Sequence, residues 1–102
     1  ALLESPDAVT TRQAAGALSS LAYNNKDNQD AIRDADAIPL LVTLLGSVDV
    51  ETQRHAAGAL ANLAFNHPAT QNAIKCLIED SNLGLKDRLQ KEYLALYNLI
   101  FS

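Results

Sequence analysis

The chain has 102 residues, is 48% hydrophobic and carries a formal net charge of −4. This hydrophobic fraction indicates one small globular domain and excludes a disordered chain. The eight Lys and Arg residues are scattered, which argues against the basic patch that nucleic acid binding requires. The sequence shows no signal peptide, no apolar run that could span a membrane, and a single cysteine without an internal disulfide partner. We therefore expect a soluble protein of the cytoplasm, with the nucleus as the alternative location.

The composition predicts an all-α fold. Leu and Ala supply most of the hydrophobic residues, whereas aromatic residues are 5% of the chain and Trp is absent. Leu and Ala are strong helix formers, while strands prefer β-branched and aromatic residues. After a helix end at Ala1-Leu2-Leu3, the next predicted helix opens at Ser5-Pro6-Asp7 and ends near Asn24. Its apolar stripe, spaced by three and four residues as in a helix, consists of Ala14, Ala17, Leu18 and Leu21.

Two shorter helices are predicted next. The first lies between Lys26 and Asp36, in a largely polar stretch that has few apolar anchors. The second spans Ala37 to Ser47. Pro39 is tolerated in a first helical turn because its missing N–H would have no partner there, and Gly46 suits a helix end.

A longer helix is predicted from about Asp49 to Phe65. Ser47 or Asp49 can accept a hydrogen bond from one of the free N–H groups of the first turn. The apolar stripe of this helix again follows a helical spacing and consists of Ala56, Ala59, Leu60 and Leu63. Leu60 is expected to pack against the preceding helix and to contribute strongly to stability.

The middle helix repeats the first one. Shifting the sequence by 42 residues places Arg12–Asn24 on Arg54–Asn66, and positions 1–32 then contain 17 identities with positions 43–74. A period of this length is typical of armadillo and HEAT units, whereas tetratricopeptide and ankyrin units are shorter. Propeller blades have a similar length, but the alternation of strands is absent.

The segment Ala37–Asn66 resembles the armadillo repeat, with an Ile-Pro start to its second helix and an Ala-rich third helix that ends in Asn-Leu-Ala. The resemblance covers about residues 1–78. It implies an all-α, armadillo-type right-handed solenoid of about two repeats. We divide the chain into a partial unit (1–24), a full unit (25–66), the start of a next unit (67–78) and a divergent C-terminal helix (79–102).

That C-terminal segment is expected to lose the repeat. One helix is predicted over residues 84–102, and its second half is expected to be buried more deeply than its first. Its stripe consists of Leu85, Leu89, Tyr93, Leu96 and Ile100, with Leu94, Tyr97 and Phe101 added in the second half. We expect apolar surface at both ends of the stack, with the C-terminal helix acting as a cap or as an assembly element.

The resemblance implies that the third helices line a groove for an extended peptide or a partner protein. The predicted groove residues are Arg12, Gly16, Ser20 and Asn24 in the first unit and Arg54, Gly58, Asn62 and Asn66 in the second. Asn62 matches the peptide-holding Asn of the family, and its amide can both donate and accept hydrogen bonds. Importin-like repeats carry Trp where Gly16 and Gly58 stand, so a scaffold of the β-catenin kind is favoured over a receptor for nuclear localisation signals.

Each of these residues also has a structural interpretation. Gly16 and Gly58 are favoured as sites of close helix packing, and Asn24 and Asn66 as helix C-caps. The two arginines, Arg12 and Arg54, pair either with nearby carboxylates such as Asp7 and Glu51 or with an acidic ligand. For Asn62, a solvated surface residue is the alternative to a peptide contact.

Catalytic chemistry is disfavoured. His55 and His67 have no Cys or carboxylate partners at metal-ligand spacing, and no phosphate-binding Gly loop is present. Cys76 lies in an apolar stretch without a neighbouring His, so a buried structural thiol is favoured over a nucleophile. We therefore predict no metal and no cofactor.

The leading hypothesis is a non-catalytic scaffold that binds a protein or a peptide. The alternative is a structural self-assembly unit, or an engineered or truncated repeat fragment, that forms homo-oligomers through its solenoid ends or through residues 84–102. A hidden enzyme is the least favoured hypothesis.

Overall fold

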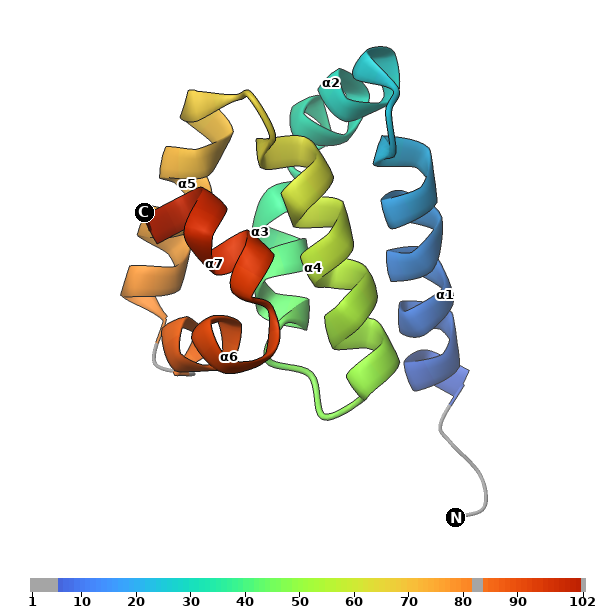
Figure 1. The fold of residues 1–102 in the computed structure, drawn as a ribbon. Coiled ribbons are helices and arrows are strands. Elements are labelled where there is room, and N and C mark those ends of the chain that lie inside the picture. Colours follow the sequence, from blue (N-terminus) through green and yellow to red (C-terminus); the bar gives the residue numbers. More distant parts are fainter. Residues whose placement is uncertain (1–5, 82–83, 102) are drawn as a thin grey trace.

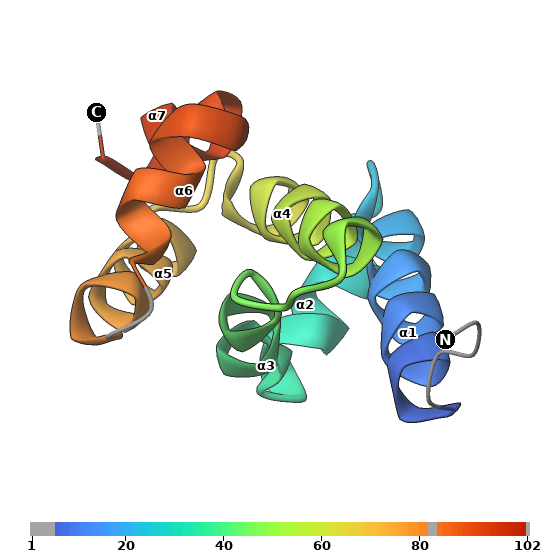
Figure 2. The same ribbon diagram turned by 90° about the horizontal axis from the view of Figure 1, so that it is seen from below.

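The computed structural model describes residues 6–81 and 84–101, which form an all-α fold without a strand in those ranges. The helices are α1 (Pro6–Ala22), α2 (Lys26–Asp34), α3 (Ala37–Leu44), α4 (Val50–Ala64), α5 (Pro68–Asp80), α6 (Leu85–Glu92) and α7 (Leu94–Phe101). Long α1 and α4 run side by side (Figure 1). Helices α2, α3 and α5 lie behind α4, and α7 lies in front of α5 (Figures 1 and 2).

The helix starts have local causes in the sequence. The side chains of Asn25 and Asp49 accept hydrogen bonds from the backbone N–H groups of Asn28 and Thr52 at the first turns of α2 and α4. His67 does the same for Thr70 in α5, where Pro68 occupies the first turn. Such caps satisfy N–H groups that have no partner within the helix.

Asn24 and Asn66 follow the ends of α1 and α4 in the left-handed backbone region, with φ values of 50° and 54°. Asn tolerates this region better than most residues, which is why it often ends a helix. The predicted C-capping role of both residues is confirmed. The chain then turns sharply into the next short helix at both places, so the 42-residue repeat is visible in the backbone as well.

One continuous core runs through the molecule behind α4. Its largest fully buried side chains come from α3, α4, α5 and α6 and include Leu41, Leu45, Leu60, Leu63, Ile74, Leu85 and Leu89. The full predicted stripe of α4 has no exposed area. The predicted burial of Leu60 in the core is therefore confirmed.

Helices α1 and α4 approach each other closely at their glycines. A Cβ atom added to Gly58 would lie 3.0 Å from Ser19 Oγ, and one added to Gly16 would lie 3.4 Å from the His55 ring. Since 3.0 Å is closer than carbon and oxygen normally approach, the absence of a side chain at Gly58 allows this spacing. The predicted packing role of the two glycines agrees with these contacts.

The helices divide into one single helix and two groups of three. Helices α2, α3 and α4 all contact one another, and so do α5, α6 and α7. α7 packs against α4, as α4 packs against α1. We interpret α5–α7 as a third, shorter unit of the stack, with α7 in the position of a third helix.

The C-terminal segment corrects the predicted single helix. Two helices, α6 and α7, are separated at Tyr93, whose φ and ψ of −134° and 57° are not helical. The break lets α6 pack on α5 while α7 turns back onto both α4 and α5. Leu85, Leu89, Leu96 and Ile100 are buried as expected, but Leu94 is 54% exposed, so deeper burial of that residue was wrong.

The two ends of the stack differ. At the C-terminal end, Ile74 and Ile78 of α5 are buried, and the outer side of α6 presents polar residues such as Lys86, Gln90 and Lys91. At the other end, Leu21 of α1 is 52% exposed. The expectation of apolar surface at both ends therefore agrees with Leu21 of α1 and with Leu94 of α7, but not with the polar outer side of α6. The predicted helix end at Ala1-Leu2-Leu3 lies outside the described residues.

Candidate functional site

The candidate site is the face formed by α1, α4 and α7. Two hollows open on this face, one on each side of the C-terminal half of α4. The hollow between α1 and α4 has a volume of about 310 Å³ and is lined by Tyr23, Asn24, Gln29, Asn62 and Phe65. The hollow between α4 and α7 has a volume of about 520 Å³ and is lined by Ala61, Asn62, Phe65, Ala95, Asn98 and Leu99.

Asn62 lines both hollows. Its side chain is half-buried, and its Nδ2 donates to the backbone oxygen of Ser19 in α1 at 3.3 Å. This distance is beyond the usual range of an N–H···O bond, so the bond is weak. Besides this N–H, the side chain has an amide oxygen that can accept hydrogen bonds and a second N–H that can donate one. Asn62 thus borders both hollows while making one weak hydrogen bond to α1.

Two exposed aromatic side chains lie beside Asn62. Tyr23, at the end of α1, is 72% exposed, and Phe65, at the end of α4, is 67% exposed. They occupy equivalent repeat positions, 42 residues apart. Large apolar side chains with this exposure contribute strongly to binding when a partner covers them.

The two predicted arginines have different surroundings. The Arg12 guanidinium donates to both carboxylate oxygens of Asp49, with Nε at 3.0 Å and Nη2 at 3.2 Å. Asp49 also accepts from the N–H and the hydroxyl of Thr52. The hydrogen bonds from Arg12 and then Thr52 hold the pKa of the Asp49 carboxyl well below its usual range. The hydrogen bond to Asp49 in turn raises the pKa of Arg12. Arg12 thus ties α1 to the start of α4.

Arg54 lies at the other end of the face from the aromatic rings. It is exposed and lines a further hollow of about 370 Å³ together with Gly58, Glu92 and Tyr93. The hydroxyl of Tyr93 donates to Gln53 Oε1 at 3.3 Å, and burial raises the pKa of this phenol. This arrangement leaves the Arg54 side chain at the surface, beside the break between α6 and α7.

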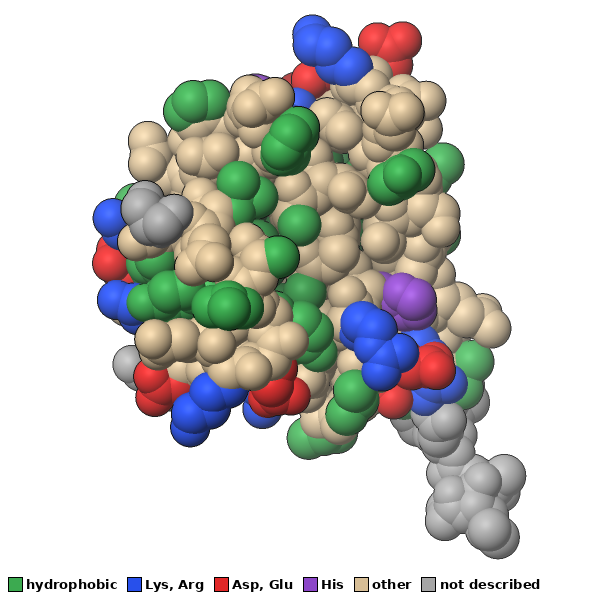
Figure 3. Space-filling view, viewed as in Figure 1, with side chains coloured by type: hydrophobic (Ala, Val, Ile, Leu, Met, Phe, Trp, Pro, Cys, Tyr) green, Lys and Arg blue, Asp and Glu red, His purple; other side chains and the backbone are tan. Residues whose placement is uncertain are grey.

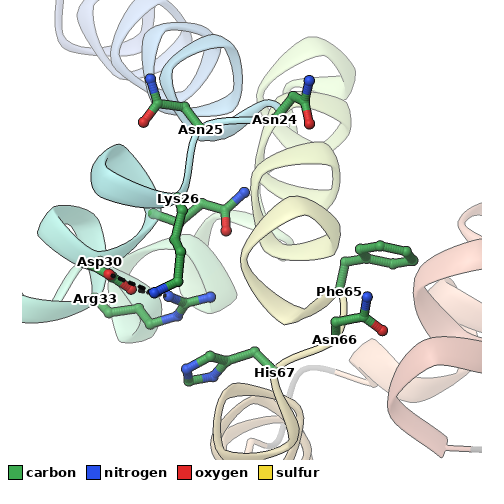
Figure 4. A pocket seen from close by; sticks show the side chains of 9 residues that line it. Asn24, Asn25, Lys26, Asp30, Arg33, Phe65, Asn66 and His67 are labelled. Carbon is green, nitrogen blue, oxygen red and sulfur yellow. Dashed lines mark hydrogen bonds and ion pairs between the residues drawn. The ribbon is translucent and has the colours of Figure 1, made fainter.

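The remaining predicted residues lie on α1 or in the loops that follow α1 and α4. Ser20 is exposed on α1. Asn24 and Asn66 line a hollow of about 400 Å³ between the two helix-ending loops (Figure 4). Lys26, Asp30, Arg33 and His67 also line this hollow, and Arg33 donates to Asp30 Oδ1 at 2.8 Å and to Thr70 Oγ1 at 2.9 Å. Because Arg33 also donates to the backbone oxygen of Leu63, this charged cluster joins α2 to α4 and α5.

Asn98 is a site residue that the predictions missed. The segment Ala95–Phe101 matches Ala59–Phe65 at five of seven positions, but at an offset of 36 residues instead of 42. The match places Asn98 on Asn62, and both residues line the α4–α7 hollow. A search for one fixed period overlooks this correspondence because the third unit is shorter.

Several features bear on chemistry and on membranes. Among the described residues, no three or more His, Cys, Asp and Glu side chains cluster as metal ligands would. No helix in residues 6–81 and 84–101 combines the length and apolarity of a membrane span.

Cys76 is exposed and free, so the expected burial of this thiol was wrong. Ile74 and Ile78 face the core, and residue 76 therefore falls on the opposite side of α5.

Comparison with known proteins agrees with this architecture. Residues 25–65 match the family model of the armadillo/beta-catenin-like repeat. Human and mouse proteins named splicing regulator ARVCF are 50% identical over 46 residues, which cover 44% of this chain and 5% of theirs. The chain thus matches only a small part of these relatives, and no solved structure gives a significant match. The described residues form an all-α, armadillo-type repeat fold, in which residues 25–65 match the armadillo/beta-catenin-like repeat.

Proposed function

We propose that the chain is a non-catalytic scaffold that binds an extended peptide or protein segment across α1, α4 and α7. The position of Asn62 carries this proposal, because its amide borders the hollows on both sides of α4. An amide can pair with both the N–H and the C=O of a peptide backbone. Asn98 of α7 places a second amide beside the α4–α7 hollow. Armadillo repeats generally mediate protein binding, which supports the same function.

The ligand-binding roles of Ser20, Asn24, Arg54, Gly58 and Asn66 belong to this proposal. Arg54 and Gly58 line one hollow beside α7, Asn24 and Asn66 line the hollow between the helix-ending loops, and Ser20 is exposed on α1. The role of Arg12 is secondary, since a ligand carboxylate would compete with Asp49 for it. A location in the cytoplasm or nucleus completes the proposal, because reducing compartments keep thiols such as Cys76 free.

Selection from a displayed library of random peptides, followed by affinity measurement, tests the proposal. The double variant Asn62→Ala, Asn98→Ala is expected to bind selected peptides at least about tenfold more weakly, which corresponds to about 1.4 kcal/mol. Asn72→Ala is the matched control, because Asn72 is an exposed Asn on α5, away from this face. Equal affinity of both variants and the parent chain would contradict the assigned site.

A second candidate function is self-association through α1. Its support is the exposed stripe at the N-terminal end of the stack, where Ala14, Ala17 and Leu21 face outward. Two copies that pack these stripes together would bury them. Light scattering over a range of concentrations tests this candidate: dimers that Leu21→Glu abolishes would support it, and a monomer at all concentrations would exclude it.

A further inference from the structure

The groove has an unusual distribution of charge. The residues that line the two hollows beside α4 are amides, aromatic residues and aliphatic residues, and none of them is Lys, Arg, His, Asp or Glu. Charged side chains line the adjoining hollows: Lys26, Asp30 and Arg33 line the one that shares Asn24, Gln29 and Phe65 with the α1–α4 hollow, and Arg54 and Glu92 line the one at the other end. Figure 3 shows the same separation, with acidic and basic side chains gathered toward the margins of the face.

Phe65 lies at the border of the uncharged stretch, because it also lines the hollow that contains Lys26, Asp30 and Arg33. It lines both hollows, and this large apolar residue is 67% exposed. Tyr23 borders the α1–α4 hollow with similar exposure, and Leu99 and Ala95 border the hollow on the other side. Covering such rings with apolar groups is favourable, while burying an unpaired charge against them is costly.

We propose that the groove selects extended segments with uncharged, largely apolar side chains, which Phe65 anchors between the two hollows. This inference rests on the proposed function and adds the chemical class of the ligand. Apolar side chains of the ligand occupy the hollows on both sides of the Phe65 ring. Its backbone pairs with the amides of Asn62 and Asn98. A basic or an acidic segment finds no opposite charge in this stretch, so its binding would lose the hydration of each buried charge without compensation.

The test uses an array of dodecapeptides in three sets that share one backbone length. The first set contains only uncharged residues, the second replaces alternate positions by Lys, and the third replaces them by Glu. The full chain is expected to bind members of the uncharged set. Their affinity should change less than about twofold between 50 mM and 500 mM NaCl, because salt screens only charged contacts.

Phe65→Ala is expected to weaken these peptides at least about tenfold, whereas Phe65→Tyr, which keeps the ring, should bind like the parent. Leu40→Ala is the matched control, since Leu40 is a 54% exposed apolar residue on α3, outside the groove. Melting curves of all variants confirm that each protein is folded before its affinity is compared.

The outcomes separate the inference from the function on which it rests. Uncharged peptides that bind at all salt concentrations and require Phe65 would support both. Lys or Glu peptides that bind best, lose affinity with salt and depend on Asn62 would overturn the inference and leave peptide binding intact. Uncharged peptides that bind equally well to Phe65→Ala would overturn the anchor. Failure of all three sets to bind would overturn the inference and the proposed function together.

Discussion

Helices α1 and α4 carry the same apolar stripe, 42 residues apart, in opposite environments. In α4, the stripe of Ala56, Ala59, Leu60 and Leu63 has no exposed area. In α1, the equivalent Ala14, Ala17 and Leu21 are exposed and Leu18 is only half-buried. Since the residues are nearly identical, the difference comes from the neighbours. Helix α4 has α3 and α5 behind it, whereas the main contacts of α1 are with α4 and α2.

A second side, which carries Ala residues at equivalent positions, is buried in both α1 and α4. Ala15 and Ala22 of α1 are fully buried, and the equivalent Ala57 and Ala64 of α4 are 5% and 0% exposed. Helix α4 is therefore packed on two sides, and α1 on one. The sequence of a repeat thus determines which sides of a helix are apolar, and the adjacent units determine which of those sides are buried.

At the C-terminal end of the stack, α6 and α7 pack against α5. Deleting residues 84–102 should remove four buried side chains, Leu85, Leu89, Leu96 and Ile100, and should expose Ile74 and Ile78. Burial of each such side chain contributes about 1.5–3 kcal/mol, and total stabilities are only about 5–15 kcal/mol. The truncated chain should unfold or aggregate, as measured by circular dichroism and light scattering. A truncated chain that remains monomeric and equally stable would show that α6 and α7 are dispensable.

The two stripes can be compared at one equivalent pair, Leu60 in α4 and Leu18 in α1. Leu60→Ala should lower the free energy of unfolding by about 2–5 kcal/mol, because it leaves a cavity in a closed core. Leu18→Ala should cost less than half as much, since this side chain is already partly in water. Urea denaturation of both variants measures the difference. Equal losses would mean that α1 is packed as fully as α4.

The Arg12–Asp49 pair, which joins α1 to the start of α4, predicts that the stability of the fold depends on pH. The pKa of Asp49 is lowered by its hydrogen bonds to Arg12 and Thr52, whereas an unfolded Asp titrates near pH 4. Its contribution to stability is therefore complete above that pH and is lost as the pH falls below it. Asp49→Asn should be less stable than the parent at pH 7, and the gap should shrink below about pH 4.

Thermal melting at several pH values measures this gap. Asp7→Asn is the matched control, because Asp7 holds the equivalent position at the start of α1 and is exposed. A gap between the parent and Asp49→Asn that is the same at pH 3 and pH 7 would contradict the ion pair.

Much of the fold was predictable from local sequence. The stripe of α4, the Asn residues after α1 and α4, and the caps at Asp49 all follow from helical spacing and turn chemistry, which depend on nearby residues. Other features depend on contacts between distant residues. No Pro or Gly marks the break at Tyr93 in the sequence. The Arg12–Asp49 pair joins positions that are 37 residues apart. The burial of Cys76 was predicted wrongly because an apolar neighbourhood in sequence does not specify a side of α5.

The candidate site was less predictable than the fold. The resemblance to a known repeat identified the face and placed Asn62 on it, but not the exposure of Phe65 or the charge-free stretch around it. Those properties arise where α1, α4 and α7 meet. Asn98 was hidden because the third unit is six residues shorter than the 42-residue period, as offsets of 42 and 36 show.

We propose that the third helices use two different sides. The apolar stripe packs against neighbouring helices, and the side that carries Asn62 binds a ligand. Amide chemical shifts of the labelled chain, recorded by NMR during titration with an uncharged dodecapeptide, test it most directly. We expect the shifts to concentrate at Asn62, Phe65 and Asn98. Shifts that concentrate instead at Ala14, Ala17 and Leu21 on the open stripe of α1 would contradict it.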